Sequence, residues 1–177
     1  MIILQVKNRN AGERLSMRIM VSACLIGENC KYNGGNNKSE ELLNLISGYE
    51  VIAVCPEVLG GLPTPRQPSE LRDGRVISRG GQDVDAAFRL GAEKCLAIAQ
   101  REKPELIILQ SRSPSCGVKQ RYDGSFSGRL ETGAGVTAEL LLRHGYSVLD
   151  IGDKEQIRAK MREVQERKRA SDTMRSI

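Results

Sequence analysis

The chain has 177 residues, a formal net charge of +5 and only 3% aromatic residues, with no Trp. This length allows one domain with a real core, which Leu, Ile, Val and Ala must build. No apolar run approaches the ~20 residues needed to span a membrane, and the N-terminus lacks the pattern of a signal peptide. We therefore expect a cytoplasmic protein without a membrane partner.

The positive charge lies at the two ends of the chain. Residues 1–16 carry three Lys or Arg against one Glu, and residues 151–177 carry eight against five Asp or Glu, so the part between them is neutral. A basic end is more often a solvated helix or tail than a binding arm. This distribution disfavours nucleic acid as a partner.

Four apolar runs predict buried strands, and helical periodicity is seen between and after them. The strands are expected at residues 18–23, 51–55, 104–109 and 146–151, and the helices at 39–47, 83–100, 136–144 and 153–168. Strands that alternate with helices imply a parallel sheet covered on both faces. We predict a single-domain, Rossmann-like three-layer α/β sandwich with a mostly parallel sheet and a short irregular β insertion, a small edge strand within residues 70–78. Asp83 is expected to cap the second helix.

The two ends of the chain look different from the part between them. Residues 1–16 are polar and lack periodicity after Val6, so we expect an N-terminal extension before an α/β domain at residues 17–152. Residues 153–177 are expected to form a charged C-terminal helix and tail. In that helix Ile157, Met161 and Val164 make only a thin apolar stripe, which predicts loose docking.

The five cysteines and the single His shape the choice of chemistry. An odd number of cysteines in a chain without secretory features favours metal, cluster or catalytic use over a disulfide framework. Cys24 and Cys30 follow the first strand, and Cys116 lies in the Ser-Pro-Ser-Cys-Gly turn after the third. Because the carboxyl ends of neighbouring parallel strands meet at one edge of a sheet, we expect these three thiols to converge there.

The spacing of these thiols limits what they can bind. Cys24 and Cys30 are separated by five residues, which is neither a zinc knuckle nor a thioredoxin-type motif. Three thiolates can hold three irons of a [4Fe–4S] cluster and leave the fourth iron open for substrate. The alternative is three reduced, partly buried thiols with no cofactor. We interpret Cys55 as strand packing and Cys95 as a helix core residue.

Other polar residues near these turns have both a catalytic and a structural interpretation. Glu57 follows the second strand, in a Gly- and Pro-rich segment that we expect to be an irregular loop, and is a candidate general acid or base, or a partner of Arg66 or Arg112. Ser113 and Ser115 are candidates to hydrogen-bond a substrate or cluster, or they form the turn. Gly133 and Gly135 precede a helix and weakly indicate an anion cradle.

Five segments together resemble the bacterial family known as domain of unknown function 523, some members of which are thiouracil desulfurases. The matching segments are residues 21–35, 54–66, 111–117, 122–128 and 133–138. The resemblance covers roughly residues 17–150 and is specific, because several long loop motifs agree in order. Residues 1–16 and the basic tail lie outside it.

The resemblance implies a [4Fe–4S] cluster held by Cys24, Cys30 and Cys116. Because one iron of such a cluster would be open, we expect the cluster to be labile in air. The resemblance also implies a catalytic carboxylate at Glu57 and a catalytic serine at Ser113 or Ser115. The expected reaction is non-redox removal of sulfur from a thiocarbonyl compound such as a thiouracil derivative, with release of sulfide. A small thiolated nucleobase or derivative is the expected partner.

Two other functions remain alternatives at this point. One is a non-catalytic Fe–S or thiol sensor whose basic ends contact nucleic acid, which predicts salt-sensitive binding. The other is a zinc-holding structural domain, which predicts one zinc per chain and colourless protein. A sulfur-inserting enzyme is disfavoured because the sequence has no Walker-type loop.

Overall fold

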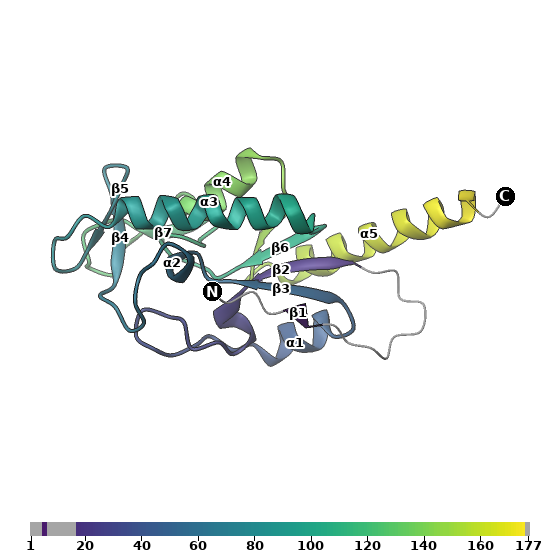
Figure 1. Cartoon of the computed structure of the whole chain (residues 1–177), viewed down its shortest axis with the longest axis horizontal. Coiled ribbons are helices and arrows are strands. Elements are labelled where there is room, and N and C mark those ends of the chain that lie inside the picture. Colours follow the sequence, from purple (N-terminus) through teal and green to yellow (C-terminus); the bar gives the residue numbers. More distant parts are fainter. Residues whose placement is uncertain (1–4, 7–16, 176–177) are drawn as a thin grey trace.

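A five-stranded sheet forms the middle layer of the computed structural model, which describes residues 5–6 and 17–175 (Figure 1). Its strands are β1 (Gln5–Val6), β2 (Arg18–Ser22), β3 (Glu50–Val54), β6 (Leu106–Leu109) and β9 (Val148–Asp150). They lie in the order β1-β3-β2-β6-β9, and the last four are parallel. The predicted parallel sheet is therefore confirmed.

The central strands are buried on both faces, as their unbroken apolar sequences predict. Ile19 of β2 pairs with Val51 of β3 and Leu106 of β6, and all three point into one core cluster. Met20, the next residue, joins the cluster on the opposite face with Ile107. The alternation arises because successive side chains of a strand point to opposite faces.

Helices cover both faces, which confirms the predicted three-layer sandwich. The helices on one face are α1 (Glu40–Ile46) and α5 (Lys154–Arg175), and those on the other are α3 (Asp85–Glu102) and α4 (Val136–Arg143). Figure 1 shows α3 and α4 above the sheet and α1 below it. No helix of the described residues is long and apolar enough to cross a membrane.

The N-terminal ends of two helices differ in how they are capped. Ser39 caps α1 through its side chain, which accepts the N–H of Leu42 at 3.2 Å. The residue at the N-cap of α3 is Val84, so the prediction that Asp83 occupies this position is wrong. The Asp83 carboxylate still accepts the N–H of Asp85 at 3.0 Å, because a short acidic side chain reaches a helical N–H from one position earlier too.

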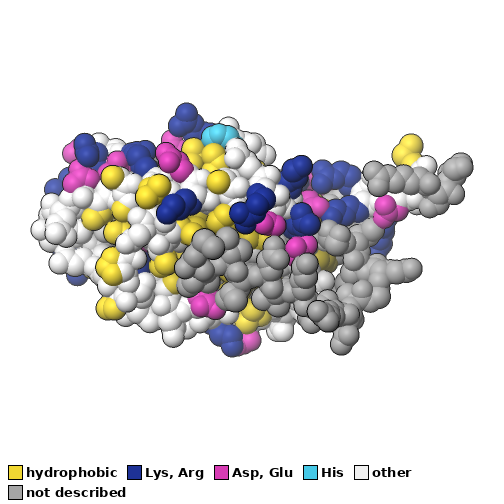
Figure 2. Space-filling view, in the orientation of Figure 1, with side chains coloured by type: hydrophobic (Ala, Val, Ile, Leu, Met, Phe, Trp, Pro, Cys, Tyr) yellow, Lys and Arg dark blue, Asp and Glu magenta, His cyan; other side chains and the backbone are white. Residues whose placement is uncertain are grey.

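Helix α5 is longer and better anchored than its sequence predicts. Ile157 is 1% exposed, Met161 5% and Val164 0%, so the thin stripe is fully inserted into the core and the expectation of loose docking is wrong. The second half of α5 extends beyond the sheet in Figure 1. On the face in Figure 2, Lys and Arg side chains gather along α5, as the charge distribution predicts.

Two hairpins and one edge strand lie outside the four strands that the sequence predicts for the main sheet. The hairpins are β4 (Ser69–Arg72) with β5 (Arg75–Ser78), and β7 (Gln120–Tyr122) with β8 (Leu130–Thr132). Each hairpin is a separate two-stranded sheet, so the prediction of an edge strand within residues 70–78 is wrong, although the irregular β insertion is present. Residues Gln5–Val6 form the edge strand β1, which pairs antiparallel with β3. The rest of the expected extension, residues 1–4 and 7–16, lies outside the described residues.

Candidate functional site

A cavity of about 720 Å³ opens where β2, β3 and β6 end. Its walls come from the turns after these three strands and from both hairpins. The predicted site residues on the wall are Cys24, Cys30, Glu57, Ser113 and Cys116. The expectation that the three thiols converge at the carboxyl edge of the sheet is met by this cavity. Ser115 is the one predicted site residue that does not line it.

The loop after β2 folds back on itself and so brings two thiols to the cavity. A 3-10 helix, η1 (Ala23–Ile26), follows the strand and ends at Gly27, whose φ of 105° suits a residue without Cβ. The N–H of Asn37 then returns to the carbonyl of Cys24 at 2.9 Å. Cys24 and Cys30 are buried, with 8% and 3% of their surfaces exposed.

The turn that carries Cys116 is pressed against the start of α4. The N–H groups of Gly135, Val136 and Thr137 donate to turn carbonyls at 2.8 to 3.0 Å. A Cβ at Gly135 would lie 2.6 Å from the backbone of Ser115, so glycine permits this contact. The anion cradle expected at Gly133 and Gly135 is therefore wrong, because the free N–H groups of the helix already have partners.

Two of the buried thiols, those of Cys30 and Cys116, have raised pKa values. The neighbouring Cys24 thiol, through a hydrogen bond, raises the pKa of Cys30 to about 11. Burial raises the pKa of Cys116 well above its ordinary value. Metal ligands must be deprotonated, so binding of a metal or cluster at these thiols releases protons.

The donor set of the cavity fits an iron–sulfur cluster. Three thiols, the preferred ligands of such clusters, face one cavity. Among the described residues, no group of three or more Cys, His, Asp or Glu is arranged to hold one metal ion. Three cysteine ligands would leave one iron of such a cluster without a protein ligand.

Glu57 lies in a short helix, α2 (Pro56–Leu59), within the segment that the sequence predicts to be irregular. Pro56 begins the helix, where its fixed φ is favourable and its missing N–H is no loss. Two glycines let α2 lie directly on α3: a Cβ on Gly60 would come within 2.0 Å of the carbonyl of Ala87, and one on Gly91 within 2.0 Å of that of Pro56. Backbone contact with a long helix thus fixes the position of Glu57.

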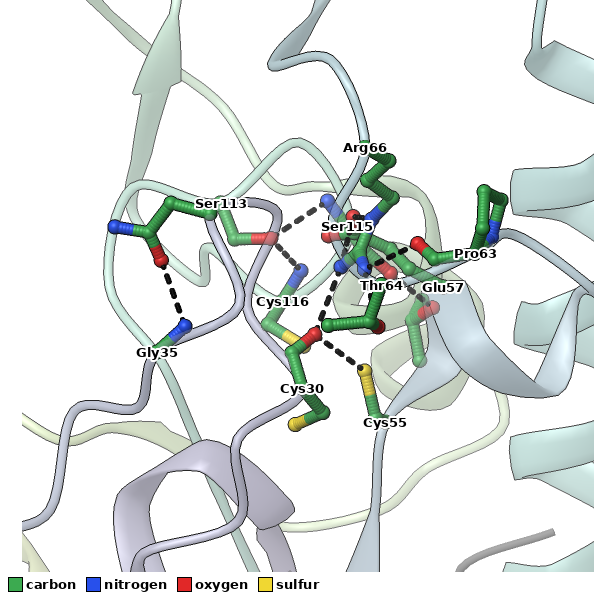
Figure 3. Close-up of polar contacts among 12 residues, drawn as sticks. Cys30, Gly35, Cys55, Glu57, Pro63, Thr64, Arg66, Ser113, Ser115 and Cys116 are labelled. Carbon is green, nitrogen blue, oxygen red and sulfur yellow. Dashed lines mark hydrogen bonds and ion pairs between the residues drawn. The ribbon is translucent and has the colours of Figure 1, made fainter.

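One carboxylate oxygen of Glu57 is held by Arg66, as Figure 3 shows. Nε and Nη2 of Arg66 both lie 2.7 Å from Glu57 Oε2. The other oxygen, Oε1, has no hydrogen bond to any described residue and is available to a water or substrate. Glu57 therefore forms the ion pair with Arg66 that the sequence offers as an alternative, and it still has an oxygen available for a catalytic role.

The two candidate serines have different surroundings. Ser113 is half-buried on the cavity wall, and its Oγ accepts the N–H groups of Ser115 and Cys116, each at 3.1 Å. Ser115 is fully buried, and its hydroxyl lies 2.8 Å from Thr137 Oγ1. The geometry therefore favours Ser113 as the hydroxyl that a ligand can reach.

Several cavity residues were not predicted as functional. Cys55, interpreted as strand packing, is half-buried on the wall, and its Sγ lies 3.8 Å from the carbonyl oxygen of Cys30. Phe126 has a φ of 56°, an uncommon value for a bulky residue, and Arg79 lies 5.7 Å from its ring centroid. The sequence indicates a functional role for these residues only through their position in loops that follow strands.

Fold and cavity together define a Rossmann-like α/β protein with a thiol-lined site at the carboxyl edge of its sheet. Comparison with protein families identifies the family of this protein: residues 19–153 match the model of the 2-thiouracil desulfurase family. The chain belongs to this family. The resemblance in the sequence motifs is thereby confirmed, and helix α5 lies beyond the matched residues.

Two similar proteins place the chain more closely. It is 40% identical over 141 residues to the uncharacterized protein YbbK of Bacillus subtilis (strain 168). The aligned region covers 74% of this chain and 93% of YbbK. It also matches a solved structure of the [4Fe-4S]-dependent thiouracil desulfidase TudS with a TM-score of 0.78 and 37% identity. That match covers 82% of this chain and 98% of TudS.

Proposed function

We propose that this protein is a [4Fe–4S]-dependent desulfidase that removes sulfur from a thiouracil derivative by hydrolysis. The observation that carries the proposal is the meeting of three thiols, one carboxylate and one hydroxyl in a single cavity. Family membership and the 37% identity to a [4Fe-4S]-dependent thiouracil desulfidase support it. A cavity of about 720 Å³ suits a small thiolated pyrimidine.

Cys24, Cys30 and Cys116 would hold the cluster through three of its irons. When bound, the cluster supplies a fourth iron without a protein ligand, which acts as a Lewis acid toward the sulfur of the substrate. The three cysteines would bind the cluster as thiolates. Their burial keeps the ligands away from bulk solvent.

Glu57 is the general base in this proposal. Its free oxygen, Oε1, takes a proton from a water molecule, and the water oxygen attacks the carbon that bears sulfur. A C–O bond forms and the C–S bond breaks, so a thiocarbonyl and water become a carbonyl and hydrogen sulfide. The reaction involves no net oxidation or reduction, so no oxidant or reductant is needed.

Ser113 is the proton donor or hydrogen-bond donor to the reacting group. Because its Oγ already accepts two backbone N–H groups, its own proton is free to point into the cavity. A hydroxyl fixed in this way can stabilise charge that develops on the departing sulfur or on the ring. Ser115 is assigned a structural role through its pair with Thr137.

The test is the content of iron and acid-labile sulfide after anaerobic reconstitution, followed by sulfide release from thiouracils. We expect about four of each per chain in the wild type, and losses in Cys24→Ala, Cys30→Ala and Cys116→Ala. Cys95→Ala is the matched control, since Cys95 is fully buried in α3 and outside the cavity. Zinc or free thiols in place of iron would contradict the proposal and favour a structural or sensor function.

A further inference from the structure

The guanidinium of Arg66 joins two parts of the site that come from different strands. It contacts Glu57, which follows β3, and the carbonyl of Cys30, which belongs to the loop after β2. The side chain of Arg66 is only 7% exposed. Figure 3 shows it between Glu57 and Cys30, with dashed lines to both.

Each of the three nitrogens of this guanidinium makes a hydrogen bond. Nε and Nη2 contact Glu57 Oε2 at 2.7 Å, and Nη2 also donates to the carbonyl oxygen of Cys30 at 3.0 Å. Nη1 donates to the carbonyl of Pro63 at 3.1 Å and to Thr64 Oγ1 at 3.2 Å. Four of these contacts are hydrogen bonds, and the contact between Nη2 and Glu57 is an ion pair. A planar guanidinium held through all three nitrogens has one orientation, so it fixes the positions of its partners relative to each other.

The carbonyl of Cys30 is held from a second side. The thiol of Cys55, the residue directly after β3, donates to the same oxygen at 3.8 Å. The backbone N–H of Arg66 also donates to the carbonyl of Tyr32 at 2.7 Å, which fastens the segment after Cys30. Cys30 is therefore presented to the cavity by contacts with the Cys55–Arg66 segment as well as by its own loop.

We propose that Arg66 is a positioning residue with two tasks: it aims the free oxygen of Glu57, and it fixes the peptide group that orients the Cys30 thiolate. The inference rests on the proposed function, because it concerns the base and a cluster ligand of that reaction. Cys55 assists the second task through the hydrogen bond from its thiol to the Cys30 carbonyl. Binding of the cofactor and placement of the base are thereby coupled through one side chain.

The test compares Arg66→Lys and Arg66→Gln with the wild type, in the full chain after anaerobic reconstitution. Lysine keeps the charge but has one compact ammonium that cannot contact both Glu57 and the Cys30 carbonyl as a fork does. We expect kcat for thiouracil to fall about 100-fold in Arg66→Lys, with KM changed less than about threefold. Loss of iron to a chelator is expected to be about tenfold faster.

A matched control lies elsewhere in the chain. Arg89 also contacts a carboxylate, Asp85 at 2.7 Å, and a backbone carbonyl, that of Gly74 at 2.9 Å, but it is outside the cavity. Arg89→Lys should match the wild type in kcat and in the rate of iron loss. Thermal melting of each variant separates a local effect from general unfolding.

Two further variants separate the tasks. Glu57→Gln should lose turnover but retain iron like the wild type, and Arg66→Lys in the Glu57→Gln background should lose iron as fast as Arg66→Lys alone. If Arg66→Lys does not fold, Cys55→Ala tests the hold on the Cys30 carbonyl and should accelerate iron loss about twofold to threefold, less than is expected of Arg66→Lys.

Wild-type rates of both turnover and iron loss in Arg66→Lys would overturn the inference. Slower turnover with wild-type iron retention would also overturn it, because the coupling to Cys30 would be absent. If the wild type binds iron but releases no sulfide from thiouracils, the proposed function fails. The rate of iron loss then still decides whether Arg66 holds Cys30.

Discussion

The hydroxyl of Ser113 accepts the backbone N–H of Cys116 at 3.1 Å, so the proposed catalytic hydroxyl and a proposed cluster ligand are fixed in one turn. The same oxygen accepts the N–H of Ser115. The second hydroxyl of the turn, that of Ser115, faces the protein interior and Thr137. Two serines two residues apart therefore have different environments, and substitutions should separate them.

Ser113→Ala is expected to lower kcat about 100-fold, because the proton that assists sulfur departure is lost. Ser113→Thr keeps a hydroxyl and the acceptor for both N–H groups, so it should retain most of the activity. The measurement is sulfide release per loaded cluster, with iron content determined on the same samples. Equal activity of Ser113→Ala and the wild type would remove Ser113 from the mechanism.

Ser115→Ala is expected to act on stability. It leaves the buried hydroxyl of Thr137 without its partner, which costs about 1–3 kcal/mol of unfolding free energy. The double variant with Thr137→Val should be less destabilised than the sum of the single variants, because both polar groups are gone. Urea unfolding of the four proteins measures this coupling, and turnover per cluster in Ser115→Ala should stay near the wild type. A large fall in that turnover would instead favour Ser115 as the catalytic serine.

Glu57→Gln should abolish turnover while iron content stays unchanged. Glutamine keeps the size of the side chain but cannot take a proton from water. Glu131→Gln is the control, since Glu131 also pairs with an arginine, Arg121 at 3.0 Å, outside the cavity. Full activity of Glu57→Gln would mean that another group activates the water.

The meeting of the thiols was predictable because it depends on strand order and on a general rule. Apolar runs predict β2 and β6 as buried strands, and parallel neighbours bring the turns that follow them to one edge. The sequence positions of Cys24, Cys30 and Cys116 are enough to place them in those turns. The structure brings them to one cavity.

The role of Arg66 was less accessible to sequence reasoning. Its partners, Glu57, Pro63 and Cys30, are 9, 3 and 36 residues away, and no periodicity links them. The sequence predicts only that Glu57 has Arg66 or Arg112 as a possible ion-pair partner. Choosing between two arginines requires the path of the loop, which backbone contacts determine.

Helix α2 was missed for a related reason. Four residues with a Pro and a following Gly-Gly have little helical signal. The helix is stabilised from outside, by the close approach of Gly60 in its C-cap to Gly91 and Ala87 of α3. Tertiary contact therefore overrides local propensity at the segment that carries the proposed base.

Gly91→Ala tests this contact, because local propensity and packing predict opposite signs. In an isolated helix the change from glycine to alanine would stabilise the helix by about 1 kcal/mol. Here the added Cβ would lie 2.0 Å from the carbonyl oxygen of Pro56, so α2 must move. We expect a loss of about 1–3 kcal/mol in unfolding free energy and a fall in kcat, since Glu57 moves with α2.

The control for Gly91→Ala is Ala97→Gly at an exposed position of the same helix. It should cost about 1 kcal/mol through propensity alone and leave kcat unchanged. Urea unfolding and sulfide release on both variants are the measurements. A stabilised and fully active Gly91→Ala would show that α2 does not depend on this approach.

The loop between β7 and β8 should respond to acid through Asp123. The hydroxyl of Ser125, 2.5 Å from Oδ1, and then the guanidinium of Arg129 lower the pKa of Asp123 to about 2. An unfolded chain has an Asp pKa of about 3.9. The folded state therefore favours the ionised carboxylate, and the resulting stabilisation is fully present above pH about 4 and is lost as pH falls toward 2.

Asp123→Asn removes this dependence and should be less stable than the wild type at pH 7. The difference between the two proteins should narrow as pH falls below about 4, because the wild-type carboxylate becomes protonated as well. Urea unfolding of both proteins without cluster, at pH 7, 4 and 3, measures this difference in unfolding free energy. Asp73→Asn, in the turn between β4 and β5, is the control, since asparagine tolerates its φ of 48°. A constant difference between wild type and Asp123→Asn at all three pH values would show that the loop does not depend on the charge of Asp123.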